Sequence, residues 1–267
     1  MPRPGGLSGF TGRPMSRPWN GSPLSRVNTL VATGAKPKTL VLLPGMDGGT
    51  TLSESFRRAL PDSLCATAIA YPPDDPLGYD ELEELVRARL ADVEGPFVLV
   101  AESFSGPIAV RIAAAPPPGL VGLVVVASFV RPPLPSILKL AARPALFRFP
   151  LPRSVVRRYL LGESADDQAV DEVLAAVAST SPEALARRVR EILSVDVRDS
   201  FSSIRLPTLW IEAAQDRVLK PATDTLAALN PKVEVTSLDA PHLLLRSSPR
   251  EAVALVNVFF VQIPWPD

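Results

Sequence analysis

The stretch VLVAESFSGPIAVRIAAA, residues Val98–Ala115, places two serines between two apolar runs. The first run has the aliphatic residues typical of a buried strand, and the second has the composition of a helix. A serine at a sharp strand-to-helix turn is exposed at the edge of a sheet, where it can act as a nucleophile. The stretch therefore predicts a strand, a turn and a helix, with either Ser103 or Ser105 in the turn.

The sizes of the neighbouring side chains favour Ser103. Such a turn requires small residues two positions before and two positions after the nucleophile. For Ser103 these positions hold Ala101 and Ser105, which are both small. For Ser105 they hold Ser103 and Pro107, and a proline ring is bulky for this place. We expect Ser103 to be the nucleophile and Ser105 to be the small residue that allows the turn, although an ordinary strand-to-helix turn would give the same local pattern.

Short apolar runs alternate with amphipathic helical segments along most of the chain. The strand-like runs are nearly continuous, as burial on both faces of a parallel sheet requires. Right-handed crossovers would then place helices on both faces. The expected strands are residues 39–45, 63–72, 96–102, 120–129, 207–214 and 233–240, and the expected helices are residues 50–60, 79–93, 105–115, 222–230 and 248–262. The pattern predicts an α/β fold with an open, mostly parallel sheet of about six strands.

Two segments do not follow this alternation. Residues 1–36 mix Pro, Gly, Ser and Arg with little periodicity, which is typical of a flexible leader. Residues 131–203 contain several helical patterns and no convincing strand, so we expect a helical insertion at the carboxyl edge of the sheet, where open α/β sheets bind ligands. The predicted organisation is a leader (1–36), a core (37–130 and 204–267) and an inserted helical lid (131–203).

Composition excludes several functional classes. The 28 basic and 28 acidic residues balance, so no overall field attracts nucleic acid or an anionic membrane. The single cysteine, Cys65, excludes an intrachain disulfide and a cysteine-based metal site. No apolar run approaches the roughly 20 residues that span a bilayer, and no apolar core typical of a signal peptide follows the first arginines. We expect a cytoplasmic protein with no nucleic-acid partner and no integral membrane association; the sequence leaves the oligomeric state open.

An aspartate and a histidine follow Ser103 in the order of a Ser–acid–His triad. His242, the only histidine, lies after the last expected strand and before the final helix, and Asp216 follows the preceding strand. Each has a structural alternative, because lone histidines are often structural and aspartates after strands often form turns. Their order along the chain favours catalysis, so Ser103, Asp216 and His242 are the candidate catalytic residues.

Four segments together resemble the α/β-hydrolase superfamily, close to its lid-bearing branch of small carboxylesterases. They are LVLLPGMDGG (40–49), VLVAESFSGPIA (98–109), LWIEAAQDRVLKP (209–221) and APHLLLRSSPREAVALVNVFF (240–260). The chain departs from the family pattern at Pro44, where a histidine is common, and at Ala101 and Ser105, which replace two glycines of the turn. The usual opening β-hairpin is absent or compressed into residues 27–31.

The resemblance implies a serine hydrolase that cleaves carboxylic esters of short to medium acyl chains through an acyl-enzyme intermediate. His242 would take the proton of Ser103, and Asp216 would orient the imidazole. The backbone amides of Met46 and Phe104 would form the oxyanion hole. We expect no metal and no organic cofactor, and a small-molecule ester with an apolar acyl part as the substrate. Acyl transfer, C–C hydrolysis with the same triad and a non-catalytic binding scaffold are the alternatives.

Overall fold

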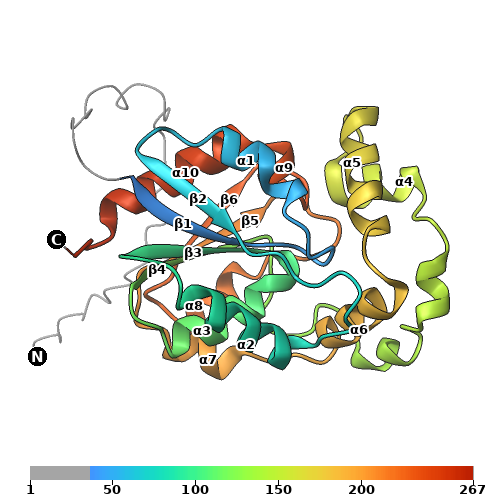
Figure 1. Cartoon of the computed structure of the whole chain (residues 1–267), viewed down its shortest axis with the longest axis horizontal. Helices are drawn as coiled ribbons and strands as arrows, with labels where there is room; N and C mark the ends of the chain where they lie inside the picture. Colours follow the sequence, from blue (N-terminus) through green and yellow to red (C-terminus); the bar gives the residue numbers. More distant parts are fainter. Residues whose placement is uncertain (1–36, 267) are drawn as a thin grey trace, which may run out of the picture. The chain divides into compact units, whose positions relative to one another are not determined.

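The computed structural model describes residues 37–266, which form one sheet of six parallel strands with helices around it (Figure 1). The strands are β1 (Lys38–Leu43), β2 (Leu64–Ala68), β3 (Phe97–Glu102), β4 (Leu120–Val126), β5 (Thr208–Ala213) and β6 (Glu234–Leu238). Their order in the sheet is β2-β1-β3-β4-β5-β6. The predicted parallel α/β sheet is therefore confirmed.

The strand order has a switch point between β1 and β3. From β1 the chain first moves outward to β2 and then returns to the other side of β1 to form β3. In open α/β sheets, ligands bind beyond the carboxyl ends of the strands at such a point. Leu43, the last residue of β1, is paired with Ala101 in β3. The loop after β1 and the turn after β3 therefore begin side by side.

The inner strands are buried on both faces because their sequences are continuous apolar runs. All six residues of β3 are buried, and so are all six residues of β5. The edge strands β2 and β6 contain exposed and half-exposed positions instead. This difference follows from position, since an edge strand has a neighbour on one side only.

Helices cover both faces of the sheet, each with its own apolar core. One face carries α2 (Tyr79–Leu90), α3 (Gly106–Ala114), α7 (Arg198–Ser203) and α8 (Thr223–Leu229). The other face carries α1 (Glu54–Arg58), α9 (Leu244–Ser247) and α10 (Pro249–Gln262). Figure 1 shows the two sets on opposite sides of the strands. On α10, Val253, Val256 and Phe260 are buried at the three- and four-residue spacing of a helix that packs along one stripe.

The segment between β4 and β5 lies beyond the carboxyl ends of the strands (Figure 1). Before α7 it contains η3 (Ser136–Leu140), η4 (Pro144–Arg148), α4 (Arg153–Val155), the π-helical η5 (Val156–Leu161), α5 (Asp167–Ala178) and α6 (Pro182–Ile192). Two helices have side-chain caps, because Asp166 Oδ1 accepts the Ala169 amide of α5 and Ser181 Oγ accepts the Ala184 amide of α6. α5 and η5 form a third apolar cluster with Leu52 of the short turn η1 (Thr51–Ser53).

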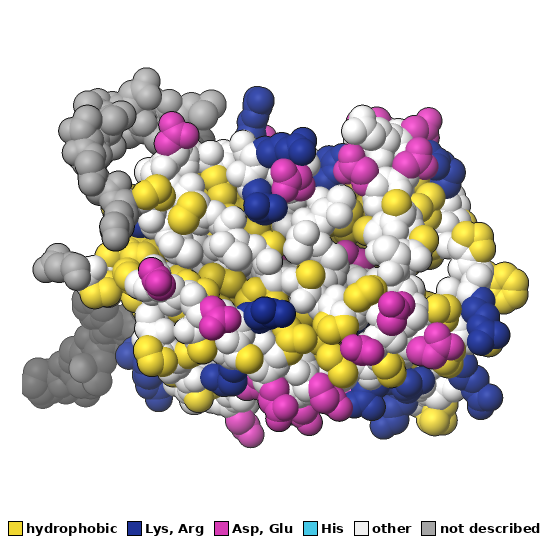
Figure 2. Space-filling view, in the orientation of Figure 1, with side chains coloured by type: hydrophobic (Ala, Val, Ile, Leu, Met, Phe, Trp, Pro, Cys, Tyr) yellow, Lys and Arg dark blue, Asp and Glu magenta, His cyan; other side chains and the backbone are white. Residues whose placement is uncertain are grey.

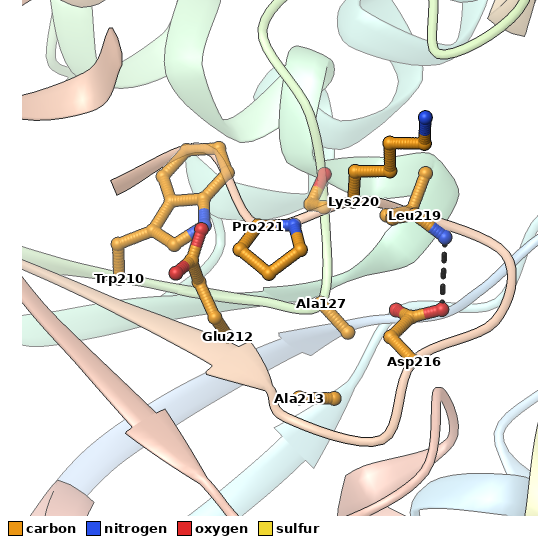
Figure 3. Close-up of a pocket in the computed structure, with 9 residues that line it drawn as sticks. Ala127, Trp210, Glu212, Ala213, Asp216, Leu219, Lys220 and Pro221 are labelled. Atoms are coloured by element: carbon orange, nitrogen blue, oxygen red, sulfur yellow. Dashed lines mark hydrogen bonds between the residues drawn. The ribbon is translucent and has the colours of Figure 1, made fainter. Parts of the chain in front are cut away.

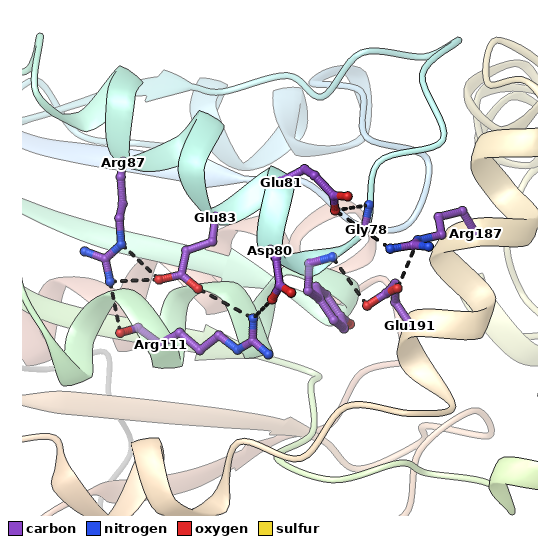
Figure 4. Close-up of polar contacts among 9 residues, drawn as sticks. Gly78, Asp80, Glu81, Glu83, Arg87, Arg111, Arg187 and Glu191 are labelled. Carbon is purple, nitrogen blue, oxygen red and sulfur yellow. Dashed lines mark hydrogen bonds and ion pairs between the residues drawn. The ribbon is translucent and has the colours of Figure 1, made fainter.

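Ion pairs join α2 to its neighbours (Figure 4). Arg111 of α3 lies 2.6 Å from Asp80 and 3.6 Å from Glu83. Arg187 of α6 lies 3.8 Å from Glu81. These side chains are partly exposed, so each pair contributes about 0–1 kcal/mol. They link α2 to α3 and to α6 at the surface.

Two expectations fall on residues outside 37–266. The leader predicted at residues 1–36 and the compressed hairpin predicted at residues 27–31 both lie outside the described residues. Within the described residues, no helix has the length and apolar character needed to cross a membrane.

Candidate active site

Ser103 lies in a strained turn at the carboxyl end of β3. It starts the 3₁₀ turn η2 (Ser103–Ser105), which leads directly into α3, and its φ is 51°. Such a left-handed conformation is unfavourable for a residue with a Cβ, so the surrounding structure must hold it. The Ser103 carbonyl accepts a 2.6 Å hydrogen bond from Ser128 Oγ. A Cβ on residue 106 would lie only 1.9 Å from Ser128 Oγ, so this position requires a glycine. The glycine of the turn therefore comes three residues after Ser103.

The structure brings the three candidate catalytic side chains into one hydrogen-bonded chain. Ser103 Oγ lies 2.9 Å from His242 Nε2, and His242 Nδ1 lies 2.7 Å from Asp216 Oδ2. An ionised carboxylate can only accept, so Nδ1 donates to Asp216 and Nε2 is free to accept from the serine hydroxyl. The amides of Val218 and Leu219 donate to Asp216 Oδ1 at 2.7 and 2.9 Å. Both oxygens of this buried carboxylate are thus oriented.

A second acid, Glu212 near the end of β5, binds the residues at the start of α8, and Asp216 is the acid that binds His242. Ala222 N donates to Glu212 Oε1 at 2.6 Å, and the Thr223 hydroxyl donates to its other oxygen, so Glu212 fixes the start of α8. Figure 3 shows Glu212 and Asp216 on different sides of a cavity of about 10 Å³. That volume suits about one water molecule and no ester. The cavity is lined by Ala127, Ser128, Trp210, Glu212, Ala213, Asp216, Leu219, Lys220 and Pro221.

The two candidate oxyanion amides lie at the ends of adjacent strands. Met46 belongs to the turn after β1, and Phe104 directly follows Ser103. Within residues 37–266, neither backbone N–H has a hydrogen-bond partner. Tyr79 OH donates to the Phe104 carbonyl at 3.0 Å, which fixes the far side of that residue's backbone. The two amides therefore have no partner among the described residues.

Side chains from three different parts of the fold hold the loop after β1. Each donates a hydrogen bond to a backbone carbonyl of this loop. Ser105 Oγ donates to Pro44 O. Arg188 Nη1 donates to Met46 O at 2.9 Å, and Thr180 Oγ1 donates to Asp47 O at 2.6 Å. The Met46 N–H shares its planar peptide with the Gly45 carbonyl, which accepts a hydrogen bond from Gly48 N at 3.1 Å, and the bonds to Pro44 O and Met46 O hold the two flanking peptides. The orientation of the Met46 amide is thus set by contacts on both sides of it.

Ser105 does more than the sequence predicts. It is fully buried, and its hydroxyl proton is used on Pro44 O. Tyr71 OH lies 2.6 Å from Ser105 Oγ and therefore donates to it. Burial raises the pKa of Tyr71 far above its usual value, so the phenol keeps the proton that it donates. The residue expected only to be small also connects the turn at Ser103 to the loop after β1.

Arg188 is a site residue that sequence analysis missed. It is fully buried in α6, and its Nη2 donates to Pro72 O at 2.9 Å in addition to the bond to Met46. Gly48 has a φ of 74°, and a Cβ there would lie 2.6 Å from Arg188 Nη1. One signal was available, because Arg188 follows Leu185 by three residues and Ala184 by four, on the buried stripe of α6.

Glu102, which precedes Ser103, is a buried carboxyl. It accepts a 3.4 Å hydrogen bond from the amide of Leu245, three residues after His242. Burial raises the pKa of Glu102 to about 8. A carboxyl with such a pKa is largely protonated near neutral pH, so it places little negative charge beside Ser103.

The pH dependence of stability should report this burial. The unfolded chain ionises Glu102 near 4.5 and the folded chain near 8, so wild-type stability should fall as pH rises between these values and level off above them. We compare the free energies of unfolding of Glu102→Gln and wild type, measured with urea at about pH 5 and about pH 8. The difference should shift in favour of the variant by at least about 1 kcal/mol between the two pH values. Glu234→Gln, on the exposed side of β6, is the control, and an equal gain there would contradict the prediction.

No group of three or more His, Cys, Asp or Glu in the described part of the chain is placed to hold a metal ion.

Comparisons with known proteins place the chain in a family. The sequence model of the alpha/beta hydrolase family matches residues 7–255. No curated protein matches the chain. Solved structures share its fold, and at these identities the likeness concerns the fold alone. They include an enol-lactonase from Burkholderia xenovorans (18% identity, 85% of this chain and 92% of that chain, TM-score 0.69), a hydrolase from Pseudomonas aeruginosa (20%, 84% and 90%, 0.71) and a thermophilic esterase from Thermogutta terrifontis (19%, 85% and 90%, 0.70). Because the family pattern covers most of its sequence, the chain belongs to the alpha/beta hydrolase family.

Proposed function

We propose that the chain is a serine hydrolase that cleaves carboxylic esters through an acyl-enzyme intermediate. The observation that carries this proposal is the continuous hydrogen-bonded chain from Asp216 through His242 to Ser103, with distances of 2.7 and 2.9 Å. A serine hydroxyl is a weak nucleophile unless an adjacent base takes its proton. Membership of a hydrolase family, and fold neighbours named as an esterase and an enol-lactonase, support the same reaction class.

The geometry gives each residue of the triad a defined step. Ser103 Oγ attacks the acyl carbon while His242 Nε2 takes its proton. The tetrahedral intermediate collapses, the ester C–O bond breaks, and His242 returns the proton to the leaving alkoxide. Water then attacks the acyl-enzyme, again giving a proton to His242, and the carboxylic acid leaves as Ser103 regains its proton. Asp216 keeps the ring in the tautomer that these steps need.

The oxyanion of each tetrahedral intermediate would lie against the amides of Met46 and Phe104. In comparable sites one such donor lowers the barrier by about 3 kcal/mol. The bonds from Ser105 and Arg188 to the loop after β1 support this role, since they hold the peptides on either side of the Met46 amide before the substrate binds. Preorganised donors are effective because they need not reorient during the reaction.

The proposed substrate is a small ester with an apolar acyl part of short to medium length. The helical segment 131–203 would act as a lid over the carboxyl edge of the sheet. The single cysteine supports a cytoplasmic location. Acyl transfer and C–C hydrolysis would use the same triad, and a binding scaffold would use none of it.

A fluorophosphonate probe tests the nucleophile directly. We expect wild-type protein to be labelled at Ser103, as read by mass spectrometry of the labelled peptide, and Ser103→Ala to remain unlabelled. Heat-denatured wild type is the control, because activation of the serine requires the folded triad. Absence of labelling, or labelling at another serine, would remove the serine-hydrolase proposal.

The same protein can then be given p-nitrophenyl esters of graded chain length, with and without added alcohols. We expect hydrolysis to be fastest with short to medium chains. A new ester formed with the added alcohol would instead identify acyl transfer as the main reaction.

A further inference from the structure

Residues 134–150, which we call the basic apolar loop, expose large apolar side chains to solvent. Within this loop only Ala142 is buried. Six of the ten large exposed apolar side chains in residues 37–266 lie here, each between 45% and 77% exposed: Leu134, Ile137, Leu138, Leu140, Leu146 and Phe149. Monomeric proteins rarely gather exposed apolar residues in one place without a binding role. Core packing does not account for these side chains.

The same loop is strongly cationic. It contains Lys139, Arg143 and Arg148, and there is no Asp or Glu anywhere between residues 131 and 162. Lys139 and Arg143 form no ion pair with any described residue, and Arg148 has only a 3.8 Å contact with the exposed Glu183. The charges of the loop therefore remain available to an external anion.

The fold holds the loop against α6 and leaves most of its large apolar side chains exposed. Ala142 is the buried anchor, and its carbonyl accepts a 2.8 Å hydrogen bond from Arg190 of α6. The turns η3 and η4 lie on either side of this anchor. Figure 2 shows apolar and basic side chains next to each other at the right-hand end of the molecule, where Figure 1 draws this part of the chain.

We propose that the basic apolar loop docks on the surface of an anionic lipid membrane. A lipid surface offers both chemistries that the loop presents, since phosphate headgroups attract Lys and Arg, and the acyl region accepts Leu and Phe side chains. A small anion would leave the six apolar side chains in water. This inference is independent of the reaction proposed for Ser103.

The charge pattern argues against a second copy of the chain as the occupant. In a twofold symmetric pair the same patch meets itself, so the loop would face its own cations. It has no acid to offer Lys139 or Arg143. An anionic membrane supplies the missing negative charge. Docking on a lipid surface also requires no shape complementarity between the loop and its partner.

Vesicle co-sedimentation of the full chain tests the proposal. The probes are phosphatidylcholine vesicles and vesicles with about one third phosphatidylglycerol, at low and high salt. We expect binding to the anionic vesicles, at least tenfold weaker binding to the neutral ones, and weakening by salt. Lys139→Glu with Arg143→Glu, and separately Leu140→Ser with Phe149→Ser, should each reduce binding at least tenfold.

The controls place the same changes elsewhere on the surface. Val261→Ser removes an exposed apolar side chain from α10, and Lys232→Glu reverses an exposed charge before β6. Both should bind as wild type does. The proposal is overturned if wild type ignores both kinds of vesicle, binds them equally, or is a dimer that the loop variants dissociate. Because vesicle binding is read without turnover, failure of the ester-hydrolysis proposal would leave this result unaffected.

Discussion

His242→Ala should lower kcat/KM for p-nitrophenyl ester hydrolysis by about 10⁴- to 10⁶-fold. The reason is geometric, since His242 is the group that contacts both Ser103 Oγ and the Asp216 carboxylate. Without it the serine proton has no acceptor, and the remaining rate comes from binding and the oxyanion amides. Asp216 keeps its two backbone donors in the variant, so the turn after β5 should survive. Steady-state kinetics and urea unfolding of the same preparation measure both effects.

The matched control is Asp239→Ala in the same loop. Asp239 is a carboxylate three residues before His242, and its side chain accepts a 2.8 Å hydrogen bond from Gln215 at the surface. Its loss should change kcat/KM by less than about twofold, because exposed polar contacts contribute little. If His242→Ala retained wild-type activity, or if Asp239→Ala lost as much, the triad would not be the catalytic unit.

The sequence predicts the sheet well because burial on both faces leaves a direct trace in residue type. The apolar runs at 96–102 and 207–214 contain β3 and β5 in full. The run at 63–72 predicts too long a strand, since β2 ends at Ala68. There the chain turns toward the site, and Tyr71 N donates to Gly48 O at 2.9 Å. Alternation of residue types cannot show such a departure, because a tertiary contact causes it.

In the candidate site, too, some features can be predicted from the sequence and others depend on tertiary contacts. Ser103, Asp216 and His242 each follow a strand, so their order along the chain was enough to group them. The contacts of Tyr71 and Arg188 depend on which helix packs against which loop, and no local pattern encodes that. Ser105 illustrates both cases. The sequence indicates its small size, but it does not indicate its hydrogen bond to Pro44 O.

Arg188→Lys should lower kcat by about 10- to 100-fold while changing KM by less than about threefold. Arg188 reaches Met46 O and Pro72 O with two separate nitrogens of one planar group. A lysine ammonium is a single point charge and does not reproduce this fork. The peptide that follows the Met46 amide would then be held less firmly, and the resulting shift of the Met46 N–H affects the transition state more than the bound ester. Arg188 is in this sense a positioning residue.

The neighbouring Arg187→Lys is the matched control. Arg187 lies on the same helix but pairs at the surface with Glu81 and Glu191 (Figure 4), so its variant should keep kcat within about twofold. Urea unfolding must accompany the kinetics, since the loss of a buried charged hydrogen bond costs about 1.5–3 kcal/mol. Affinity for a boronic acid, which forms a tetrahedral adduct with the serine, should fall in parallel with kcat. A variant that is folded, binds the boronic acid as tightly as wild type and loses activity only through KM would show that Arg188 holds α6 in place without orienting the oxyanion amide.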